Sequence, residues 1–317
     1  MTITAHTVSN AHFGANCWVL TDGAPGNVKQ ARVLARGLGL HSREFIVTLN
    51  ALDRIFAPRF RRAQFAALQL TPKPILLDCQ FAIGCGRAGA IALDALKRAR
   101  PEVRTVQILA PRCDPARFDA IVCPAHDGLS APNVYAMLGA LNDIDDAWLA
   151  AGRVQAQQLQ SLIAPASTLM LVGAPTRNAP YNAAQFAQLL QGLDASDLCM
   201  SASRRTPPEF LALMRASGAR VWTGAADGNN PYQAWLSRAA RIIVTPDSVN
   251  MISEACATFA QVDVVFADAA RGKIAVFLRS LDRRLGPNQA SVSPLRASLE
   301  VIHVLRAQLL ESGQSLS

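Results

Sequence analysis

The feature that most constrains the fold of this chain is an alternation of short, wholly apolar runs with amphipathic stretches of helical period. In the first half the apolar runs span residues 17–20, 45–49, 74–77, 106–110 and 120–123, and two of the helical stretches span 28–38 and 87–99. Strands that are buried on both faces have continuous apolar residues, and helices between such strands are typical of parallel sheets. The pattern therefore predicts a parallel sheet that is covered by helices on both faces.

The same alternation starts again after a predicted helix at 145–162 and a predicted linker at 163–167. The second set of strands spans 168–173, 197–201, 220–223, 241–245 and 262–266, with helices at 183–192, 207–216, 231–238 and 249–258. A chain of 317 residues is long for one domain and sufficient for two. We predict two doubly wound, Rossmann-like α/β domains, at residues 1–163 and 164–290. Residues 291–317 contain a last amphipathic helix that could pack back on the first domain.

An excess of eight positive charges favours an anionic partner, which could be a nucleic acid, an anionic membrane surface or a phosphorylated ligand. No helix-turn-helix, zinc-finger or basic–aromatic pattern is present, so we expect no nucleic-acid partner. The seven cysteines include no Cys-x-x-Cys pair and have no paired histidines beside them, so we expect reduced thiols and no metal. No apolar run approaches the roughly 18 residues that span a bilayer, and no secretory signal is apparent. These features predict a cytoplasmic protein.

One basic stretch could bring such a protein to a membrane. Residues 54–65 read RIFAPRFRRAQF and place Arg54, Arg59, Arg61 and Arg62 among large apolar side chains. This composition fits peripheral contact with an anionic surface such as that of the inner membrane. It equally fits a solvated helix face whose arginine stems cover the core.

In doubly wound sheets, ligands bind outside the carboxyl ends of the strands, and unusual residues of this chain collect in the loops that follow them. The first such loop, TDGAPGN, contains Asp22, Gly23, Gly26 and Asn27. It lacks the G-x-G-x-x-G and G-x-x-x-x-G-K-[ST] spacings of nucleotide-binding loops. Three roles remain open: it could cradle a phosphate, carry catalysis, or turn the chain while Asp22 or Asn27 caps the following helix. Gln30 and the loop residues His126 and Asp127 are further candidates for the same site.

The strongest of these loops is TPDSVNMISEA, residues 245–255. Asp247 or Ser248 is expected to cap a helix whose amino end, with Asn250 in its first turn, could hold a diphosphate. Glu254 could then accept hydrogen bonds from both hydroxyls of a ribose. The alternative is a capped helix with one polar face.

Two further loops of the second half offer groups for an anion. The sequence SRRTPP contains Ser203, Arg204, Arg205 and Thr206, and adjacent guanidinium groups suit a phosphate. Helix capping by Thr206 is the alternative reading of this loop. Asn230 lies in ADGNNPY, which is equally consistent with a tight surface turn.

Taken together, WVLTDGAPGNVKQA, PAHD, SRRTPPEF, DGNNPYQAWLSRA and VTPDSVNMISEA resemble the family named for a plant mitochondrial fission factor, over residues 17–270. Members of that family are similar to GT-B glycosyltransferases, in which two Rossmann-like domains face a cleft. The family often has paired glycines after the first strand of the second domain, where this chain has Gly173 and Ala174.

The resemblance implies roles for the residues singled out above. Ser248 and Glu254 would contact the nucleotide sugar, Arg204 and Arg205 would neutralise the leaving diphosphate, and Asp22 would be the base that activates the acceptor. No metal and no cofactor would be required.

Two functions follow from the resemblance. The first is a metal-independent glycosyltransferase that transfers from a UDP-, GDP-, ADP- or CMP-type sugar to an envelope glycan or a lipid-linked acceptor. The second is a non-catalytic recruitment protein on the same fold. A short-chain epimerase is not expected, because such an enzyme needs a glycine-rich dinucleotide loop and a Tyr-x-x-x-Lys pair, and we predict neither.

Overall fold

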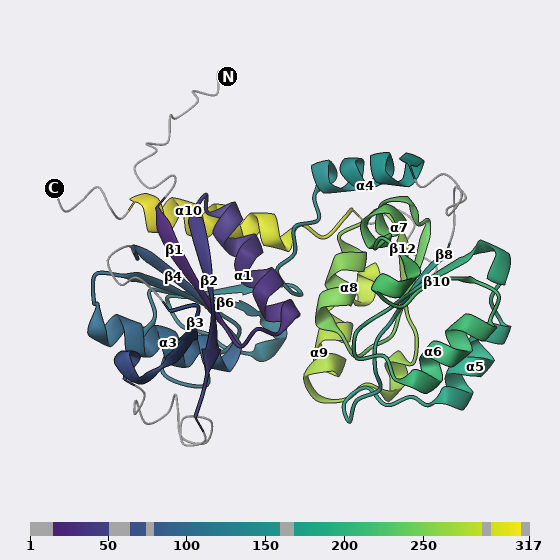
Figure 1. Cartoon of the computed structure of the whole chain (residues 1–317), viewed down its shortest axis with the longest axis horizontal. Helices are drawn as coiled ribbons and strands as arrows, with labels where there is room; N and C mark the ends of the chain where they lie inside the picture. The colour runs from purple at the N-terminus through teal and green to yellow at the C-terminus, as the bar shows by residue number, and fades with distance from the viewer. Residues whose placement is uncertain (1–14, 51–63, 74–78, 159–167, 287–292, 312–317) are drawn as a thin grey trace. The chain divides into compact units, whose positions relative to one another are not determined.

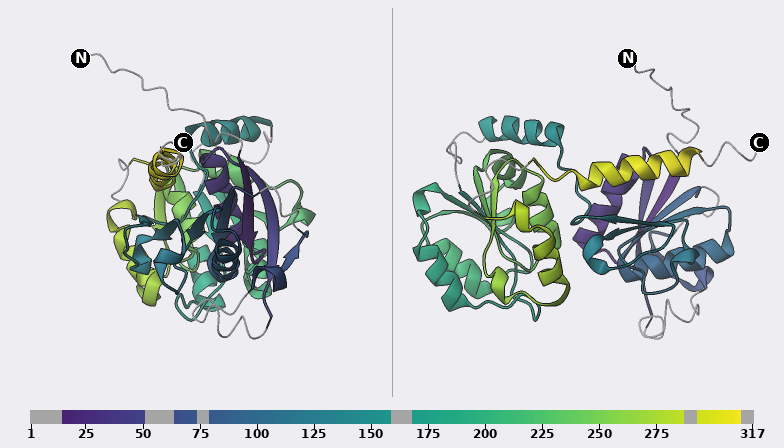
Figure 2. Two further views of the ribbon diagram at one scale, coloured as in Figure 1. Left: turned by 90° about the vertical axis from the view of Figure 1, so that its left-hand side faces the viewer. Right: turned by 180° about the vertical axis from the view of Figure 1, so that it is seen from behind.

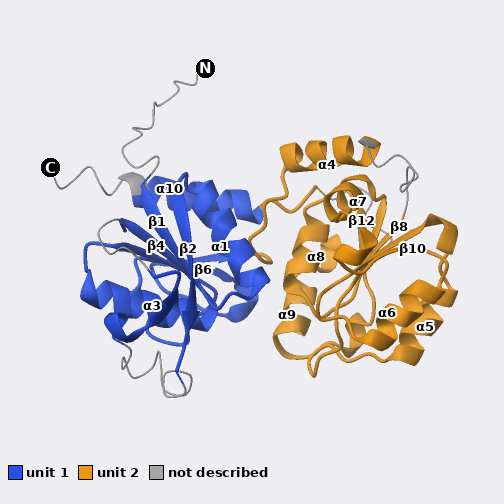
Figure 3. Cartoon of the chain, in the orientation of Figure 1, with its two compact units in different colours: residues 1–137, 297–317 blue, residues 138–296 orange. Residues whose placement is uncertain are grey.

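The computed structural model describes residues 15–50, 64–73, 79–158, 168–286 and 293–311 (Figure 1). The chain forms two compact units (Figure 3). Unit 1 comprises residues 1–137 and 297–317, and unit 2 comprises residues 138–296.

The boundary between the units lies at residue 138 and not at the expected residue 164. Helix α4 (Asp146–Gln158) belongs to unit 2 because it packs on α7 (Tyr232–Arg238). Gln233 Nε2 donates to the carbonyl of Trp148 over 2.9 Å, and a Cβ atom on Gly152 would lie 2.6 Å from the carbonyl oxygen of Gln233. This close contact between two helices requires glycine at position 152.

The sheet of unit 1 has the strand order β3-β2-β1-β4-β5-β6-β7, and only β3 runs antiparallel to its neighbour. Its strands are β1 (Asn16–Thr21), β2 (His41–Thr48), β3 (Gln69–Thr71), β4 (Phe81–Cys85), β5 (Arg104–Ile108), β6 (Ala120–Pro124) and β7 (Val134–Met137). The β1–β2 and β4–β5 connections run in opposite directions along the sheet. Because such crossovers are right-handed, their helices α1 (Pro25–Gly37) and α3 (Gly86–Ala99) cover opposite faces.

The C-terminal helix α10 (Ala297–Glu311) is part of unit 1, where it packs on α1 and β7 (Figure 2). A Cβ atom on Gly37 would lie 2.7 Å from Ile302 Cδ1, so the two helices are in close contact at this glycine. On the other face of the sheet, Trp18 and Leu20 share one buried cluster with Leu93 and Leu96 of α3. Burial of this apolar surface is the main source of stability for the unit.

Strands β3, β4 and β7 were not predicted from the sequence. The run FAIGC of β4 contains a glycine and an alanine, which lower strand propensity, yet it lies at the centre of the sheet between β1 and β5. The predicted strand at 74–77 and the predicted linker at 163–167 lie outside the described residues.

The sheet of unit 2 is entirely parallel, with the order β10-β9-β8-β11-β12. Its strands are β8 (Thr168–Val172), β9 (Leu198–Ala202), β10 (Arg220–Trp222), β11 (Arg241–Val244) and β12 (Gln261–Val264). Besides α4 and α7, its helices are α5 (Ala183–Gln191), α6 (Pro208–Ala216), α8 (Val249–Cys256) and α9 (Gly272–Ser280). All five predicted strands are present, so the predicted fold class of two doubly wound α/β units is confirmed.

Among the described residues, no helix is both long and apolar enough to cross a bilayer. Six of the seven cysteines are buried, and Cys113 is partly exposed.

Candidate functional site

Each sheet has one point where the strand order reverses, and this is where ligands bind in doubly wound folds. In unit 1 the reversal lies between β1 and β4, and in unit 2 it lies between β8 and β11. Most of the predicted site residues follow these strands or the neighbouring strand β9. The two positions are described separately, beginning with unit 2.

Asp247 is the centre of a hydrogen-bonded cluster at the carboxyl edge of the unit 2 sheet. Its side chain is fully buried. Thr245 Oγ1 donates to Oδ1 over 2.8 Å, while the backbone N–H of Ala174 and Nη2 of Arg205 donate to Oδ2 over 3.1 and 3.0 Å. A buried carboxylate is costly unless it is paired, and here three donors compensate it. The cluster joins the loops that follow β8, β9 and β11.

The Ser203–Thr206 loop is held by its own hydroxyl groups. Thr206 Oγ1 donates to the carbonyl of Val172 over 2.8 Å, and Ser203 Oγ accepts from the backbone N–H of Arg205 over 3.1 Å. Thr206 is buried, so its hydroxyl is structural, and helix α6 begins at Pro208 without the side-chain cap predicted for Thr206. Arg204 and Arg205 are both exposed, but only Arg205 is paired with Asp247.

Ser248 is the N-cap of α8. Its Oγ accepts a hydrogen bond from the backbone N–H of Met251 over 3.3 Å, and the first turn, which contains Asn250, carries no acidic residue. A hydroxyl that accepts from the helix keeps its own proton to donate. The amino end of α8 therefore offers a hydroxyl donor and the positive end of the helix dipole on the β11 side of the cluster.

Glu254 lies further along α8 and is buried against α7. The Tyr232 hydroxyl donates to Glu254 Oε2. Burial, together with this carboxylate, raises the pKa of the Tyr232 phenol well above its usual value, so the phenol remains a donor at neutral pH. Asn230 precedes this tyrosine, is exposed, and uses Oδ1 to accept from the backbone N–H of Tyr232 over 2.9 Å.

In unit 1, the loop after β1 is organised by Asp22. Its Oδ1 accepts from the backbone N–H of Ala24 over 3.0 Å and from Asn27 Nδ2 over 2.9 Å, and its side chain is exposed. Gly23 has a φ of 78°, a conformation that glycine adopts without strain. Helix α1 begins at Pro25, so Gly26 and Asn27 lie in its first turn and the N-cap is Ala24, with no side-chain cap. The expectation that Asp22 or Asn27 is the N-cap is therefore wrong.

The glycine spacing that this loop lacks is present after β4, which the sequence interpretation missed. Residues 84–89 read GCGRAG, a G-x-G-x-x-G pattern that ends a strand and begins helix α3. A Cβ atom on Gly89 would lie 2.7 Å from the carbonyl oxygen of Leu20, and Gly86 has a φ of 71° with Asn27 Nδ2 against it. The glycines thus allow the loops after β1 and β4 to meet. The prediction that the chain has no such loop is wrong, although none of its tyrosines has a lysine four residues later.

The remaining candidates of unit 1 lie in α1 and after β6. Gln30 is buried within α1. His126 and Asp127 lie in a short helical turn after β6, and β5 separates β6 from β4, so they are about 10 Å further along the sheet. Arg54, Arg59, Arg61 and Arg62 lie outside the described residues.

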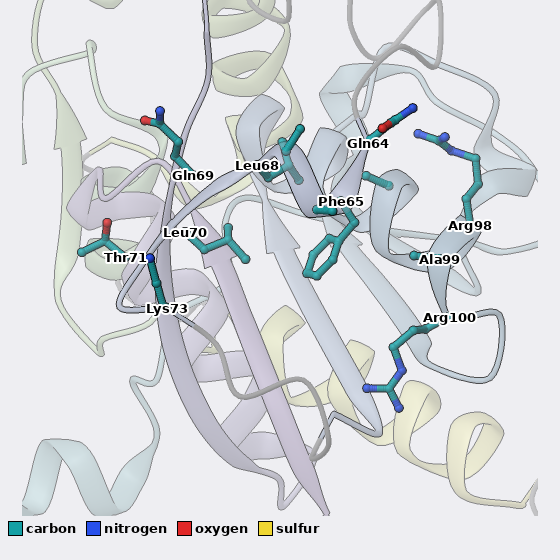
Figure 4. Close-up of a pocket in the computed structure, with 13 residues that line it drawn as sticks. Gln64, Phe65, Leu68, Gln69, Leu70, Thr71, Lys73, Arg98, Ala99 and Arg100 are labelled. Atoms are coloured by element: carbon teal, nitrogen blue, oxygen red, sulfur yellow. The ribbon is translucent and has the colours of Figure 1, made fainter.

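Unit 1 also has a hollow of about 1350 Å³ beside β3 and the end of α3 (Figure 4). Phe65, Leu68 and Leu70 contribute apolar side chains to it, and Arg98 and Arg100 stand at one side. None of the predicted site residues lines this hollow. Within the described ranges, no group of three or more His, Cys, Asp and Glu side chains is placed to hold a metal ion.

The fold of the chain is similar to that of several solved structures. It is similar to UDP-GlcNAc 2-epimerase from Methanocaldococcus jannaschii, with a TM-score of 0.52 and 11% identity over 93% of this chain and 99% of that one. It is also similar to S. aureus MnaA in complex with UDP (TM-score 0.50, 10% identity, 96% and 98% of the chains). The wall teichoic acid polymerase TagF gives a TM-score of 0.50 at 10% identity, over 94% and 90%. These likenesses establish a GT-B-like fold of Rossmann-like units.

Sequence relatives are more specific. The chain is 30% identical over 279 residues to the mitochondrial fission protein ELM1 of Arabidopsis thaliana, which covers 74% of this chain and 65% of that protein. It therefore spans just under two thirds of the plant relative. It is 25% identical over 292 residues to the uncharacterized protein RP120 of Rickettsia prowazekii, covering 77% and 81% of the two chains. The family model for mitochondrial fission ELM1 matches residues 25–300. As the predicted resemblance indicated, the chain belongs to the mitochondrial fission ELM1 family.

Proposed function

We propose that this chain is a metal-independent glycosyltransferase that uses a nucleoside-diphosphate sugar and acts on an envelope glycan or a lipid-linked acceptor at the cytoplasmic face of the inner membrane. The observation that carries the proposal is the cluster at the carboxyl ends of β8, β9 and β11. It brings Arg205 and the capped amino end of α8 to the reversal point of the unit 2 sheet. The fold, shared with a UDP complex, supports the same reading.

In this proposal the donor diphosphate lies at the amino end of α8. The Ser248 hydroxyl donates to a phosphate oxygen, and the helix dipole and the guanidinium of Arg205 stabilise the charge that develops as the sugar–phosphate bond breaks. Glu254 accepts from the ribose hydroxyls while Tyr232 holds its other oxygen. Asn230, in the loop before α7, and Asn250, in the first turn of α8, are candidate contacts for the nucleoside.

Asp22 acts as the base in the same proposal. Its Oδ1 is held by Ala24 and Asn27, and within the described part of the chain Oδ2 accepts no hydrogen bond. A carboxylate fixed through one oxygen can take the proton of an acceptor hydroxyl with the other. That hydroxyl oxygen would then form the bond to the anomeric carbon while the nucleoside diphosphate leaves.

Thermal unfolding with UDP, GDP, ADP, CMP and their sugars tests the donor site, because a ligand that binds the folded state raises the melting temperature. We expect the nucleotide of one base to raise the melting temperature. The sugar derivative of that nucleotide should release the free nucleotide when an extract of acceptor lipids is added. Glu254→Gln and Ser248→Ala should reduce the shift. If none of the nucleotides changes the melting temperature and both variants behave as wild type, the donor-site assignment is wrong.

A second candidate is a recruitment protein without catalysis, because the plant relative is named for mitochondrial fission and not for an enzyme activity. Such a protein would bind a protein partner through its surface and would not need the strand-end side chains. The recruitment function is favoured if the protein neither binds nor consumes nucleotide sugars and if the Asp22→Asn variant retains full biological function. An epimerised sugar in the same product assay would instead assign isomerisation, a reaction that proteins of this fold catalyse.

A further inference from the structure

The pair formed by Arg205 and Asp247 crosses the end of the central strand of unit 2. Arg205 follows β9, Asp247 follows β11, and β8 lies between these strands. Because β9 and β11 flank β8, these two strands are about 10 Å apart. Side chains that follow them can therefore meet only if they extend toward each other across the end of β8. The 3.0 Å contact between Arg205 Nη2 and Asp247 Oδ2 closes this distance directly above Gly173.

The two partners have opposite exposures, which separates their roles. The Asp247 side chain is fully buried, whereas 57% of the Arg205 side chain remains exposed. Three donors compensate the Asp247 carboxylate and none of its side chain is exposed, so it offers no oxygen to a ligand. The guanidinium has five N–H donors, and the structure shows one of them at Asp247. More than half of this side chain is exposed, so the remaining donors are accessible to a ligand.

Resting on the proposed function, we propose that Asp247 is a positioning residue. It fixes the guanidinium of Arg205 across the end of β8, so that Arg205, rather than Arg204, takes a phosphate of the nucleoside diphosphate. Asp247, which was predicted among the contacts of the nucleotide sugar, then acts only through Arg205. Arg204 is the natural comparison, because it is the neighbouring residue, carries the same charge and is exposed, but has no such partner among the described residues.

Two effects of the Asp247 charge oppose each other at this site. A negative charge beside the phosphate weakens anion binding by repulsion, while fixing a long side chain in advance removes the entropic cost of ordering it when the ligand binds. Three hydrogen-bond donors, one of them the cationic guanidinium, already compensate the Asp247 charge, so orientation should dominate. If orientation dominates, loss of the Asp247 charge weakens phosphate binding. If repulsion dominates, the same loss strengthens phosphate binding.

Calorimetric titration of Arg205→Lys, Arg204→Lys and Asp247→Asn separates these possibilities. The ligands are inorganic pyrophosphate, the nucleoside diphosphate that gives the largest thermal shift, and the nucleoside of the same base. A charged hydrogen bond contributes roughly a 10- to 100-fold change in affinity, so Arg205→Lys should lower the affinity for both phosphate ligands by that factor. Asp247→Asn should lower the same affinities by about tenfold. Arg204→Lys should change the affinities for the two phosphate ligands less than about threefold, and the nucleoside should bind all variants with the same affinity.

Equal effects of the two lysine variants, or tighter phosphate binding by Asp247→Asn, would overturn the inference and leave the proposed function standing. If pyrophosphate binds with this pattern but no nucleotide binds, the positioning role holds and the glycosyltransferase proposal fails. Should Asp247→Asn not fold, the guanidinium ¹⁵N signals of the wild type decide, because Arg205 must rotate slowly and Arg204, which has no such partner among the described residues, must rotate rapidly; equally rapid rotation of both would overturn the positioning role. The guanidinium ¹⁵N signals of Arg205 in the ligand-free protein give an independent measurement: slow rotation in the wild type must be lost in Asp247→Asn.

Discussion

Both carboxylate oxygens of Asp247 lie 2.2 Å from the position that a Cβ atom would take on Gly173. Real Cβ atoms do not approach oxygen so closely, and the Asp247 side chain cannot withdraw without losing its bonds to Thr245, Ala174 and Arg205. Glycine at position 173 is therefore required by a carboxylate from another strand. The following residue contributes only its backbone N–H to this carboxylate, which explains why alanine is accepted at position 174.

Gly173→Ala should consequently lower the free energy of unfolding by about 2–4 kcal/mol, because the new methyl group displaces a buried, hydrogen-bonded carboxylate. Urea unfolding followed by circular dichroism measures this difference. Ala174→Gly is the matched control, and it should cost no more than about 1 kcal/mol, from backbone entropy alone. Equal effects of the two substitutions would show that Asp247 can move away at little cost.

Asp22→Asn should abolish sugar transfer without unfolding the loop after β1. The amide retains the Oδ1 acceptor that Ala24 and Asn27 use, but it cannot take a proton from an acceptor hydroxyl. A lost general base lowers the rate by about 10²- to 10⁴-fold, whereas nucleotide affinity and melting temperature should be unchanged. Initial rates with the sugar donor identified by thermal shift test this. A variant that transfers normally contradicts the role of Asp22 as base, and one that melts early indicates a structural role.

The ribose contact assigned to Glu254 predicts discrimination between ribonucleotides and 2′-deoxyribonucleotides. The wild type should bind the ribonucleotide about tenfold more tightly, since one charged hydrogen bond is lost with the 2′-hydroxyl. Glu254→Gln should reduce this preference. Tyr232→Phe should retain it but lower the free energy of unfolding by about 1–3 kcal/mol, because it removes the phenol that donates to the buried carboxylate.

Competition binding with the two nucleotides measures the preference, and urea unfolding measures the stability. If Glu254→Gln keeps the full preference, the carboxylate pairs only with groups of the protein and does not contact ribose.

The sequence predicted the strands of unit 2 and the loops that carry its polar residues, because buried strands and their turns have local signals. It did not predict which polar residues meet. Arg205 and Asp247 are 42 positions apart, and Ala174 and Asp247 are 73 positions apart, so no spacing along the chain reveals their contacts. Strand β4 was missed because packing against α3 requires a residue that weakens the local signal of a strand. Gly84, which lowers the local strand signal, is the residue that lets α3 pack closely on this part of the sheet.

Buried thiols make stability fall in alkaline solution. Burial raises the pKa of both Cys79 and Cys256 to about 12, while a thiol in the unfolded chain ionises near pH 8.5. Above that pH the unfolded chain releases protons that the folded chain retains, so each thiol should lower the free energy of unfolding by about 1.4 kcal/mol per pH unit until its folded pKa is reached. Urea unfolding between pH 8 and 10.5 under reducing conditions should show this decline. Cys256→Ala should make the slope shallower by one thiol's share, and an unchanged slope would mean that this thiol ionises equally in the folded and unfolded states.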